Sequence, residues 1–458
     1  MNQEYYKSRE GIIGIVFFSI AIILVVIHFV FFRFSFPVSN IDEATFLSPA
    51  YSLAVHGKFS SDIHTSFLPG ADTYTYWMPP LYMFLLGVVL KTLGVTLFTA
   101  KLFSLLLILS SAVIIFFFSK DRYTRVVLVS LFLICPFIII ISARIRMEAL
   151  GIFLISLSIL SVKRKWPAYV SGIIAGLAMM THPMCIPCCV GLAFHNLRKG
   201  YKQFFLFTSV AVIVTLPYLF YILENFSLFR QQMSFQYARK MGRELTRVKL
   251  EYILQFVPTS IVALVFLYRS KQERGLKHFL YISLALTVVL ILKSNEFNYQ
   301  VYSIPYFLSA VALFLEERKD ALYRLGVPTL FFTFFLVMLV LKGHKNNNFQ
   351  NDSTYYQLTG YLAKNKDWAG KTIFVAGSYD MSTYFLVNHQ KVETINVVNE
   401  SPPDWYKKFD YVIDVVKNNN GKKEEMSKDE FWKAWQHQRK FTTSDGRYSL
   451  FTASKTGD

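Results

Sequence analysis

Long apolar runs separated by short basic clusters are the feature that most restricts how this chain can fold. The first run, residues 11–32, is interrupted only by His28 and exceeds the roughly 20 residues that cross a bilayer as a helix. It is too long for a removable signal peptide and lacks the small-residue cleavage pattern. Of the 458 residues, 53% are hydrophobic and 17% aromatic, fractions that soluble proteins rarely reach. The chain is therefore predicted to be a polytopic α-helical membrane protein.

The positions of Lys and Arg predict how the chain threads the membrane. A net charge of +18 on its own suggests a nucleic-acid ligand, but the basic residues form short clusters between apolar runs, as in the cytoplasmic loops that orient membrane spans. We therefore expect no nucleic-acid partner. The stretch 80–95 is predicted to be an interfacial or re-entrant helix, because a further span there would reverse every later cluster. With 80–95 left out, the sequence predicts about eleven transmembrane helices. They lie at 11–32, 98–118, 126–142, 148–162, 167–181, 183–196, 204–222, 250–268, 278–293, 300–315 and 324–342.

A polar stretch after residue 343 divides the chain into two predicted domains. Residues 1–343 form the membrane module, with an outer loop at 33–97 and a large basic outer loop at 223–249. Residues 344–458 have the composition of a small soluble α/β domain, which the threading places outside the cytoplasm. Its expected elements are a helix at 355–363, strands at 372–376, 392–397, 411–415 and 448–451, and a helix near 429–438.

The acidic pair Asp42-Glu43 follows the first span and precedes an amphipathic stretch. Apolar residues repeat at helical spacing as far as Val55, and Gly57 ends the pattern, which predicts an interfacial helix. A carboxylate held at a membrane surface can accept a proton from a hydroxyl group. The structural alternative is equally open on the residues alone: Asn40 as an N-cap, Glu43 as the N3 acid of a capping box, and Asp42 favouring the helix dipole.

Further charged and aromatic residues fall on the same predicted outer face. Arg144, Arg146 and Glu148 open one span, and charges beside lipid are costly unless paired or functional. His182, before Pro183, can donate a hydrogen bond to a phosphate, although a lone His is often structural. The loop 223–249 is basic although the predicted threading places it on the outer face, where few Lys and Arg residues are expected. This charge favours an anionic partner such as lipid phosphate. The remaining candidates on this face are Arg239, Lys240, Lys293, Tyr299 and Tyr302, of which the tyrosines also suit interfacial anchors.

The order of these motifs resembles the GT-C glycosyltransferases. More narrowly, it resembles the dolichyl-phosphate-mannose protein mannosyltransferase-like branch, which includes the aminoarabinose transferases of lipid A. The resemblance covers roughly residues 10–342. It rests on the Asp-Glu pair after the first span and on Trp77-Met78-Pro79-Pro80-Leu81-Tyr82, Ala143-Arg144-Ile145-Arg146-Met147-Glu148-Ala149, Gly176-Leu177-Ala178-Met179-Met180-Thr181-His182-Pro183 and Pro217-Tyr218-Leu219-Phe220-Tyr221-Ile222-Leu223.

This resemblance implies a sugar transferase that uses a polyprenyl-phosphate-linked donor at the outer face of the plasma (inner) membrane. Asp42 matches the family's general base, and Glu148 matches the second acid, which shapes the site. Arg146 and His182 match positions near the donor phosphate. Two departures stand out: Trp77-Met78 replaces the Glu-Lys that precedes Pro-Pro in the aminoarabinose transferases, and the first outer loop has no DxD. We therefore expect no essential divalent metal and no other cofactor.

The predicted activity is inverting transfer of a sugar to a hydroxyl group of a lipid, glycan or protein acceptor. The predicted catalytic residues are Asp42 and Glu148, and the predicted substrate-binding residues are Glu43, Arg144, Arg146, His182, Arg239, Lys240, Lys293, Tyr299 and Tyr302. Membrane lipids complete the expected partners. A lipid transporter or flippase, a non-catalytic lipid-phosphate receptor and an oligosaccharide ligase are the alternatives; a transporter predicts charges near span centres, whereas these charges lie at span ends.

Overall fold

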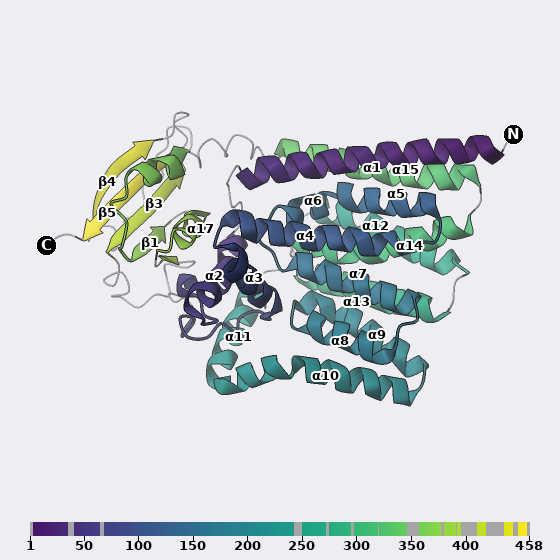
Figure 1. The fold of residues 1–458 in the computed structure, drawn as a ribbon, viewed down its shortest axis with the longest axis horizontal. Coiled ribbons are helices and arrows are strands. Elements are labelled where there is room, and N and C mark those ends of the chain that lie inside the picture. The colour runs from purple at the N-terminus through teal and green to yellow at the C-terminus, as the bar shows by residue number, and fades with distance from the viewer. Residues whose placement is uncertain are drawn as a thin grey trace.

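The computed structural model describes most of the chain. The described residues are 3–34, 41–64, 68–241, 250–271, 274–294, 297–318, 320–345, 357–376, 380–390, 392–394, 410–417, 435–442 and 448–455. A bundle of long helices is followed by a smaller unit of strands and short helices (Figure 1). The predicted fold class, a polytopic helical membrane protein with a C-terminal α/β unit, is confirmed.

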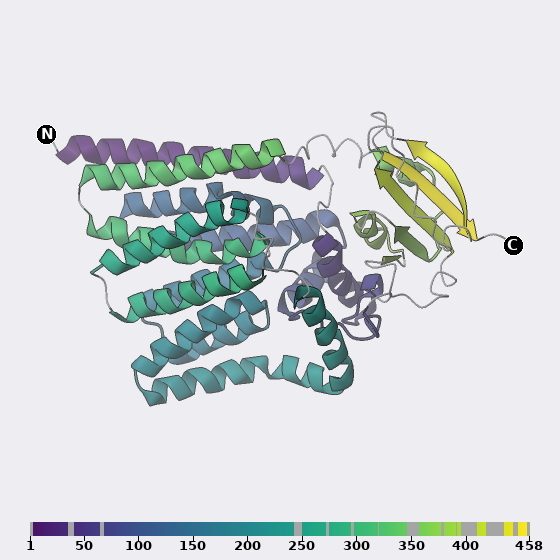
Figure 2. The same cartoon turned by 180° about the vertical axis from the view of Figure 1, so that it is seen from behind.

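Each predicted span coincides with helix in the structure. The bundle consists of α1 (Gln3–Phe34), α4 (Leu97–Phe116), α5 (Arg122–Ile134), α6 (Pro136–Ser142), α7 (Glu148–Lys163), α8 (Ala168–Met179), η2 (Pro183–Cys185), α9 (Ile186–Arg198), α10 (Tyr201–Glu224), α12 (Leu250–Arg269), α13 (Arg274–Ser294), α14 (Ile304–Glu317) and α15 (Ala321–Lys345). Both views place α1 beside α15 at one edge and α10 at the opposite edge (Figures 1 and 2). Phe17 stacks on Phe332 at 4.1 Å, which joins α1 to α15.

Fewer helices are long enough to cross a membrane than the eleven spans that the sequence predicts. Within the described residues, five helices are long and apolar enough to cross, namely α1, α4, α10, α13 and α15. A sixth candidate is the pair α5–α6, predicted as one span at 126–142 but bent by 67°. Pro136 has no N–H to donate, which accounts for the break at this position. Because α7 has only 16 residues, about 24 Å of helix, the count of eleven stays a prediction.

Short helices cover one end of the bundle, where the outer loops are predicted. They are α2 (Ile41–His56), α3 (Leu81–Leu93), α11 (Phe226–Met241) and the 3-10 helix η4 (Phe297–Ser303). The two stretches predicted as interfacial or re-entrant helices are helical in the structure, as α2 and α3, and Gly57, with φ +69°, ends α2. A Cβ at Gly87 would lie 3.0 Å from the Ala50 carbonyl oxygen, so α3 packs directly on α2.

Helix α11 is fastened to the outer loop by one buried glutamine. Gln232 is fully buried and accepts a hydrogen bond from the Tyr76 N–H at 2.8 Å. Its amide also donates to the carbonyl oxygens of Pro69 and Tyr74, each at 3.0 Å. The loop before α3 therefore uses a side chain more than 150 residues away to satisfy its backbone groups.

We expect Gln232→Ala to destabilise the purified protein by about 1–3 kcal/mol, because the donor and acceptors of the loop lose their partner in a buried setting. Thermal unfolding and the rate of proteolysis within 57–80 measure the effect. Gln231→Ala is the matched control, since Gln231 is exposed and adjacent. Equal stability of the two variants would contradict this account.

The C-terminal unit is built on a mixed five-stranded sheet of order β2-β1-β3-β5-β4. Strands β1 (Ile373–Ala376), β2 (Val392–Thr394) and β3 (Tyr411–Lys417) pair in parallel, and β5 (Tyr448–Lys455) pairs antiparallel with β3 and with β4 (Trp435–Thr442). The predicted strands are found as β1, β2, β3 and β5, except that 395–397 of the strand predicted at 392–397 lie outside the described residues. The helix predicted near 429–438 is wrong over 435–438, which form part of β4; pairing with β5 decides the conformation there, and 429–434 lie outside the described residues.

The C-terminal unit contacts the bundle through α2. Helix α17 (Asp380–Val387) packs on α2, and the Tyr51 hydroxyl lies 3.2 Å from Nδ1 of His389, just after α17. In the described part of the unit, residues 357–364 also form a short helix. Helix α2, which carries the acidic pair, therefore lies between the bundle and the sheet (Figure 1).

Candidate functional site

Glu43 is the buried member of the acidic pair. Its side chain is 1% exposed, and its carboxyl group accepts a hydrogen bond from the Ile145 N–H in the loop before α7. The cations Lys101, Arg144 and Arg146 surround it, yet Oε2 has no hydrogen-bond partner among the described residues. Burial is the largest influence and raises the pKa of Glu43, while the cations oppose the rise. Glu43 therefore contacts the loop before α7, and a residue that only caps α2 does not need this contact.

We expect stability to depend on pH through Glu43. Because the folded pKa is raised, this group stabilises the fold below its ordinary value near 4.5, and that contribution is lost as pH rises through the folded pKa. Glu43→Gln should therefore match wild type near pH 4 and become relatively more stable toward neutral pH. Thermal unfolding from pH 4 to 8 measures this, with Glu224→Gln at an exposed position as the control. Parallel profiles for wild type and Glu43→Gln would contradict the assignment.

Arg146 and Glu148 form a buried, forked ion pair. The Arg146 Nε donates to both carboxylate oxygens of Glu148 at 3.0 Å, and Nη2 donates to Oε1 at 2.6 Å. The side chains are 4% and 1% exposed, so both charges are removed from water. Such a pair is retained at a cost in desolvation, and here it fixes the start of α7 against the loop that contacts Glu43.

His182 is held in one orientation by its neighbours. Its Nδ1 accepts a hydrogen bond from the Met184 N–H at 3.0 Å, which leaves the ring proton on Nε2 as a donor. The ring stacks on Tyr302 at 5.2 Å and meets Tyr299 edge-on at 4.9 Å. A Cβ at Gly151 would lie 2.6 Å from the Tyr302 ring, so only glycine leaves room for that tyrosine.

Two site residues, Lys101 and Tyr82, were missed by the sequence reasoning. Lys101, in the first turns of α4, is 2% exposed and acts electrostatically on Glu43 and on His28 of α1. Tyr82 of α3 is fully buried and bonds Ser104 of α4 at 2.8 Å, with Glu43 and Glu148 as its charged neighbours. A lysine and a histidine inside apolar runs were the available signals, because such groups are expensive in a membrane unless they have a function or a partner.

The loop before α3 is tied to the His182 turn. The Leu81 N–H donates to the Met180 carbonyl oxygen at 2.9 Å, so the two motifs lie side by side. Trp77 is 6% exposed and stacks parallel to Phe46 of α2, with ring centroids 6.0 Å apart. The Trp77 ring therefore packs the loop before α3 against α2.

The predicted site residues divide into three groups. Glu43, Arg146, Glu148, His182 and the two tyrosines are buried together, and Arg144 is half-buried beside Glu43. Lys293 is exposed at the end of α13, at the rim of the same end of the bundle. The side chains of Asp42, in the first turn of α2, and of Arg239 and Lys240, in α11, lie outside the description, so their roles stay predictions.

No protein-family model and no curated protein matches the chain by sequence. Among solved structures, ArnT from Cupriavidus metallidurans bound to undecaprenyl phosphate is similar with a TM-score of 0.62 and 12% identity, covering 96% of this chain and 97% of its own. The structure of ArnT in the apo state is similar with a TM-score of 0.63 and 11% identity, covering 97% of this chain and 98% of its own. The Archaeoglobus fulgidus oligosaccharyltransferase in complex with Zn and sulfate gives a TM-score of 0.52 and 13% identity, covering 86% of this chain and 67% of its own. Both proteins have the GT-C fold. This chain is therefore a multi-pass membrane protein with the GT-C glycosyltransferase fold.

Proposed function

We propose that this chain is a membrane glycosyltransferase that moves a sugar from a polyprenyl-phosphate-linked donor to a hydroxyl group of a lipid, glycan or protein. One observation carries the proposal: Glu43, Lys101, Arg144, Arg146 and Glu148 are gathered at one end of a GT-C bundle, four of them buried. Ionisable groups inside a membrane protein mark functional sites by default, because burying them is costly. The polyprenyl donor is supported by the undecaprenyl phosphate that similarly folded ArnT binds.

The proposed reaction is a single displacement at the anomeric carbon. The acceptor oxygen attacks that carbon, its proton passes to the Asp42 carboxylate, and the bond to the donor phosphate breaks with inversion. Polyprenyl phosphate leaves with the electron pair of that bond. One carboxylate suffices, because a phosphate leaving group needs little protonation, whereas glycoside hydrolysis generally uses two carboxylates.

The remaining residues serve the leaving phosphate and the geometry of the site. Lys101 and Arg144 supply positive charge beside Glu43, where charge on a departing phosphate is stabilised. His182 supplies a neutral N–H donor from a fixed ring. Arg146 is already paired with Glu148, so its main role is to hold the loop that carries Glu148. The part of its positive charge that Glu148 does not neutralise acts on the phosphate.

The proposed reaction uses no divalent metal. Trp77 in the first outer loop supports this, because its ring packs on Phe46 where a subfamily acid would stand. Activity is therefore expected to persist in EDTA. The proposed setting is the plasma membrane, with the site and the C-terminal unit on the outer face and the basic helix ends on the cytoplasmic side.

Donor consumption tests the proposed function. The purified protein in proteoliposomes, supplied with polyprenyl-phosphate sugar and an envelope lipid extract, should release polyprenyl phosphate and glycosylate an acceptor. A receptor or a flippase would leave the donor intact. Mass spectrometry of envelope glycans and glycolipids, with and without active protein, would name the sugar and the acceptor.

An oligosaccharide ligase is the second candidate, favoured by the similarity to the archaeal oligosaccharyltransferase. It would use a polyprenyl diphosphate donor and transfer an oligosaccharide. Parallel assays with monophosphate and diphosphate donors separate the two functions, since each predicts turnover with only one of them.

A further inference from the structure

The C-terminal unit is packed on the helix that carries the acidic pair. Helix α17 contacts α2, and strand β2 lies against η1 (Asp62–His64) in the outer loop that follows α2. Two neighbouring residues of α17 bury their side chains in different cores: Phe385 in that of the C-terminal unit, and Leu386, 3% exposed, in that of the bundle. Leu97, at the start of α4, packs against both cores. The two units therefore share a packed apolar interface.

His389 follows α17 in a backbone conformation that favours glycine. Its φ is +59°, in the left-handed region. The turn is a Schellman motif, in which the Gln390 N–H donates to the Phe385 carbonyl oxygen and the His389 N–H donates to the Leu386 carbonyl oxygen. Glycine is the usual residue at this position, because a Cβ is strained there. Histidine therefore occupies the site at a cost in backbone energy, and such an outlier points to a use for the side chain.

The His389 side chain contacts a buried tyrosine of α2. The Tyr51 hydroxyl lies 3.2 Å from Nδ1 of His389, within hydrogen-bond distance, and the two ring centroids are 5.9 Å apart. Tyr51 is 7% exposed, and its ring also meets that of His56 edge-on at the end of the same helix. Roughly 14 Å of helix separates Tyr51 from Asp42 in the first turn. The strained residue of the C-terminal unit thus reaches the helix that carries the proposed base.

Helix α2 depends on contacts of this kind for its orientation. Pro49 lies inside the helix and has no N–H, so one hydrogen bond of the ladder is missing and the helix is less stiff than a regular one. Glu43 holds the part before Pro49 through the Ile145 N–H, and Tyr51 meets His389 after it. We infer that His389 is a positioning residue, which joins the C-terminal unit to α2 and restricts the movement of the helix that carries Asp42. The contacts alone carry this inference, and its consequence for catalysis rests on the proposed function.

Three variants of the full-length protein test the contact from both of its sides. His389→Gly relieves the backbone strain but removes the side chain. His389→Asn tolerates the left-handed conformation and places an amide atom close to the position of Nδ1. Tyr51→Phe removes only the hydroxyl group.

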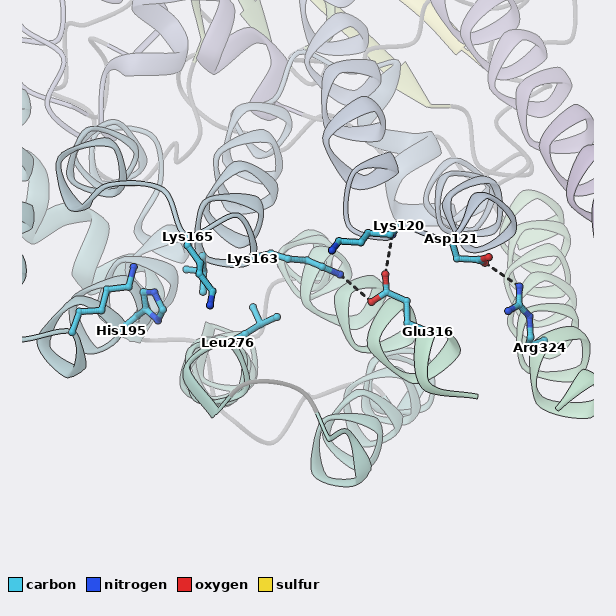
Figure 3. A pocket seen from close by; sticks show the side chains of 10 residues that line it. Lys120, Asp121, Lys163, Lys165, His195, Leu276, Glu316 and Arg324 are labelled. Atoms are coloured by element: carbon cyan, nitrogen blue, oxygen red, sulfur yellow. Dashed lines mark hydrogen bonds and ion pairs between the residues drawn. The ribbon is translucent and has the colours of Figure 1, made fainter. Parts of the chain in front are cut away.

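Lys165→Gly is the matched control for His389→Gly. Lys165 also follows a helix in a Schellman motif, with φ +54°, because the Trp166 N–H donates to the Ser161 carbonyl oxygen. It lies at the end of α7 far from the candidate site, near the ion pair of Lys163 and Glu316 (Figure 3). The same relief of strain therefore takes place at the opposite end of the bundle from α2.

Hydrogen exchange of the amides of 41–56 measures the movement of α2. Exchange should be about fivefold faster in His389→Gly and in Tyr51→Phe than in wild type, as expected for the loss of one hydrogen bond. The double variant should be no faster than either single variant, because both remove the same contact. His389→Asn and Lys165→Gly should equal wild type. Equal exchange in His389→Gly and Lys165→Gly, or additive effects in the double variant, would overturn the inference.

Sugar transfer by the same variants separates positioning from stability. At a temperature well below unfolding, kcat of His389→Gly should fall about fivefold while KM for the donor stays within about twofold, because the cations of the candidate site are unchanged. His389→Asn should restore kcat, and Lys165→Gly should leave it at the wild-type value. An unchanged kcat in His389→Gly, with or without a higher KM, would overturn the positioning role. If wild type transfers no sugar, the proposed function fails, and hydrogen exchange still decides whether His389 holds α2.

Discussion

Replacing Asp42 by Asn is expected to lower the rate of sugar transfer by about 10²–10⁴-fold, the range that a positioned general base contributes. The amide keeps the shape and polarity of the side chain but cannot accept the acceptor's proton. Release of polyprenyl phosphate by the purified protein measures the loss. Donor binding should change little, because the cations Lys101 and Arg144 remain in place beside Glu43.

Asp72→Asn is the control for Asp42→Asn, because Asp72 is an exposed acid of the same outer loop. Its turnover should equal that of wild type. Turnover of Asp42→Asn within threefold of wild type would show that Asp42 is not the general base. The same assay on Glu148→Gln would then test whether Glu148 is the general base.

Replacing Arg146 by Met is expected to destabilise the protein by about 3–5 kcal/mol. Glu148 would then be a carboxylate with 1% exposure and no cationic fork. In the double variant Arg146→Met/Glu148→Leu, both charges are gone, and most of the stability should return. Sugar transfer should not return, because the proposed site needs the acid at 148. Denaturant or thermal unfolding of the two single variants and the double variant gives the coupling between the side chains.

Arg230→Met tests whether the loss of any arginine at this end of the bundle has the same effect. Arg230 is exposed on α11, and its replacement should leave stability within about 0.5 kcal/mol of wild type. An active double variant would show that the pair holds the loop and takes no part in transfer. A double variant as unstable as Arg146→Met would contradict the buried-charge explanation.

Much of the fold was predictable because the bilayer imposes a strong periodic signal. Apolar runs predicted the helices of the bundle in order, and Gly57 and Pro80 mark where α2 ends and α3 begins. Helix α11 lies instead in the stretch 223–249, which was predicted as a basic outer loop. The break at Pro136 was not predicted, since a proline within an apolar run is compatible with a kinked single span. Strand β4 was not predicted either, because its conformation depends on β5, its neighbour in space.

The candidate site was predicted as a set of residues but not as a set of contacts. Short motifs placed Arg146, Glu148 and His182 at one face, and the structure joins Arg146 to Glu148 and His182 to the tyrosines. Glu43 had an equally good explanation as part of a helix cap, which stays a prediction because Asn40 lies outside the described residues. The structure adds the contact of Glu43 with Ile145, which no local pattern predicted. Lys101 lies inside an apolar run, and only the tertiary structure shows that it interacts electrostatically with Glu43 on another helix.

The sequence by itself determined that this is a membrane protein, where its helices lie along the chain, and that the candidate site residues fall on one face of the bundle. Those properties follow from local patterns: hydrophobic length, basic clusters and short motifs. Only the tertiary structure decided which acid is buried, which cation it meets and how the outer loops are joined through Gln232 and the Leu81–Met180 hydrogen bond. Burial and charge pairing are properties of residues brought together from distant parts of the chain, and no local pattern encodes them.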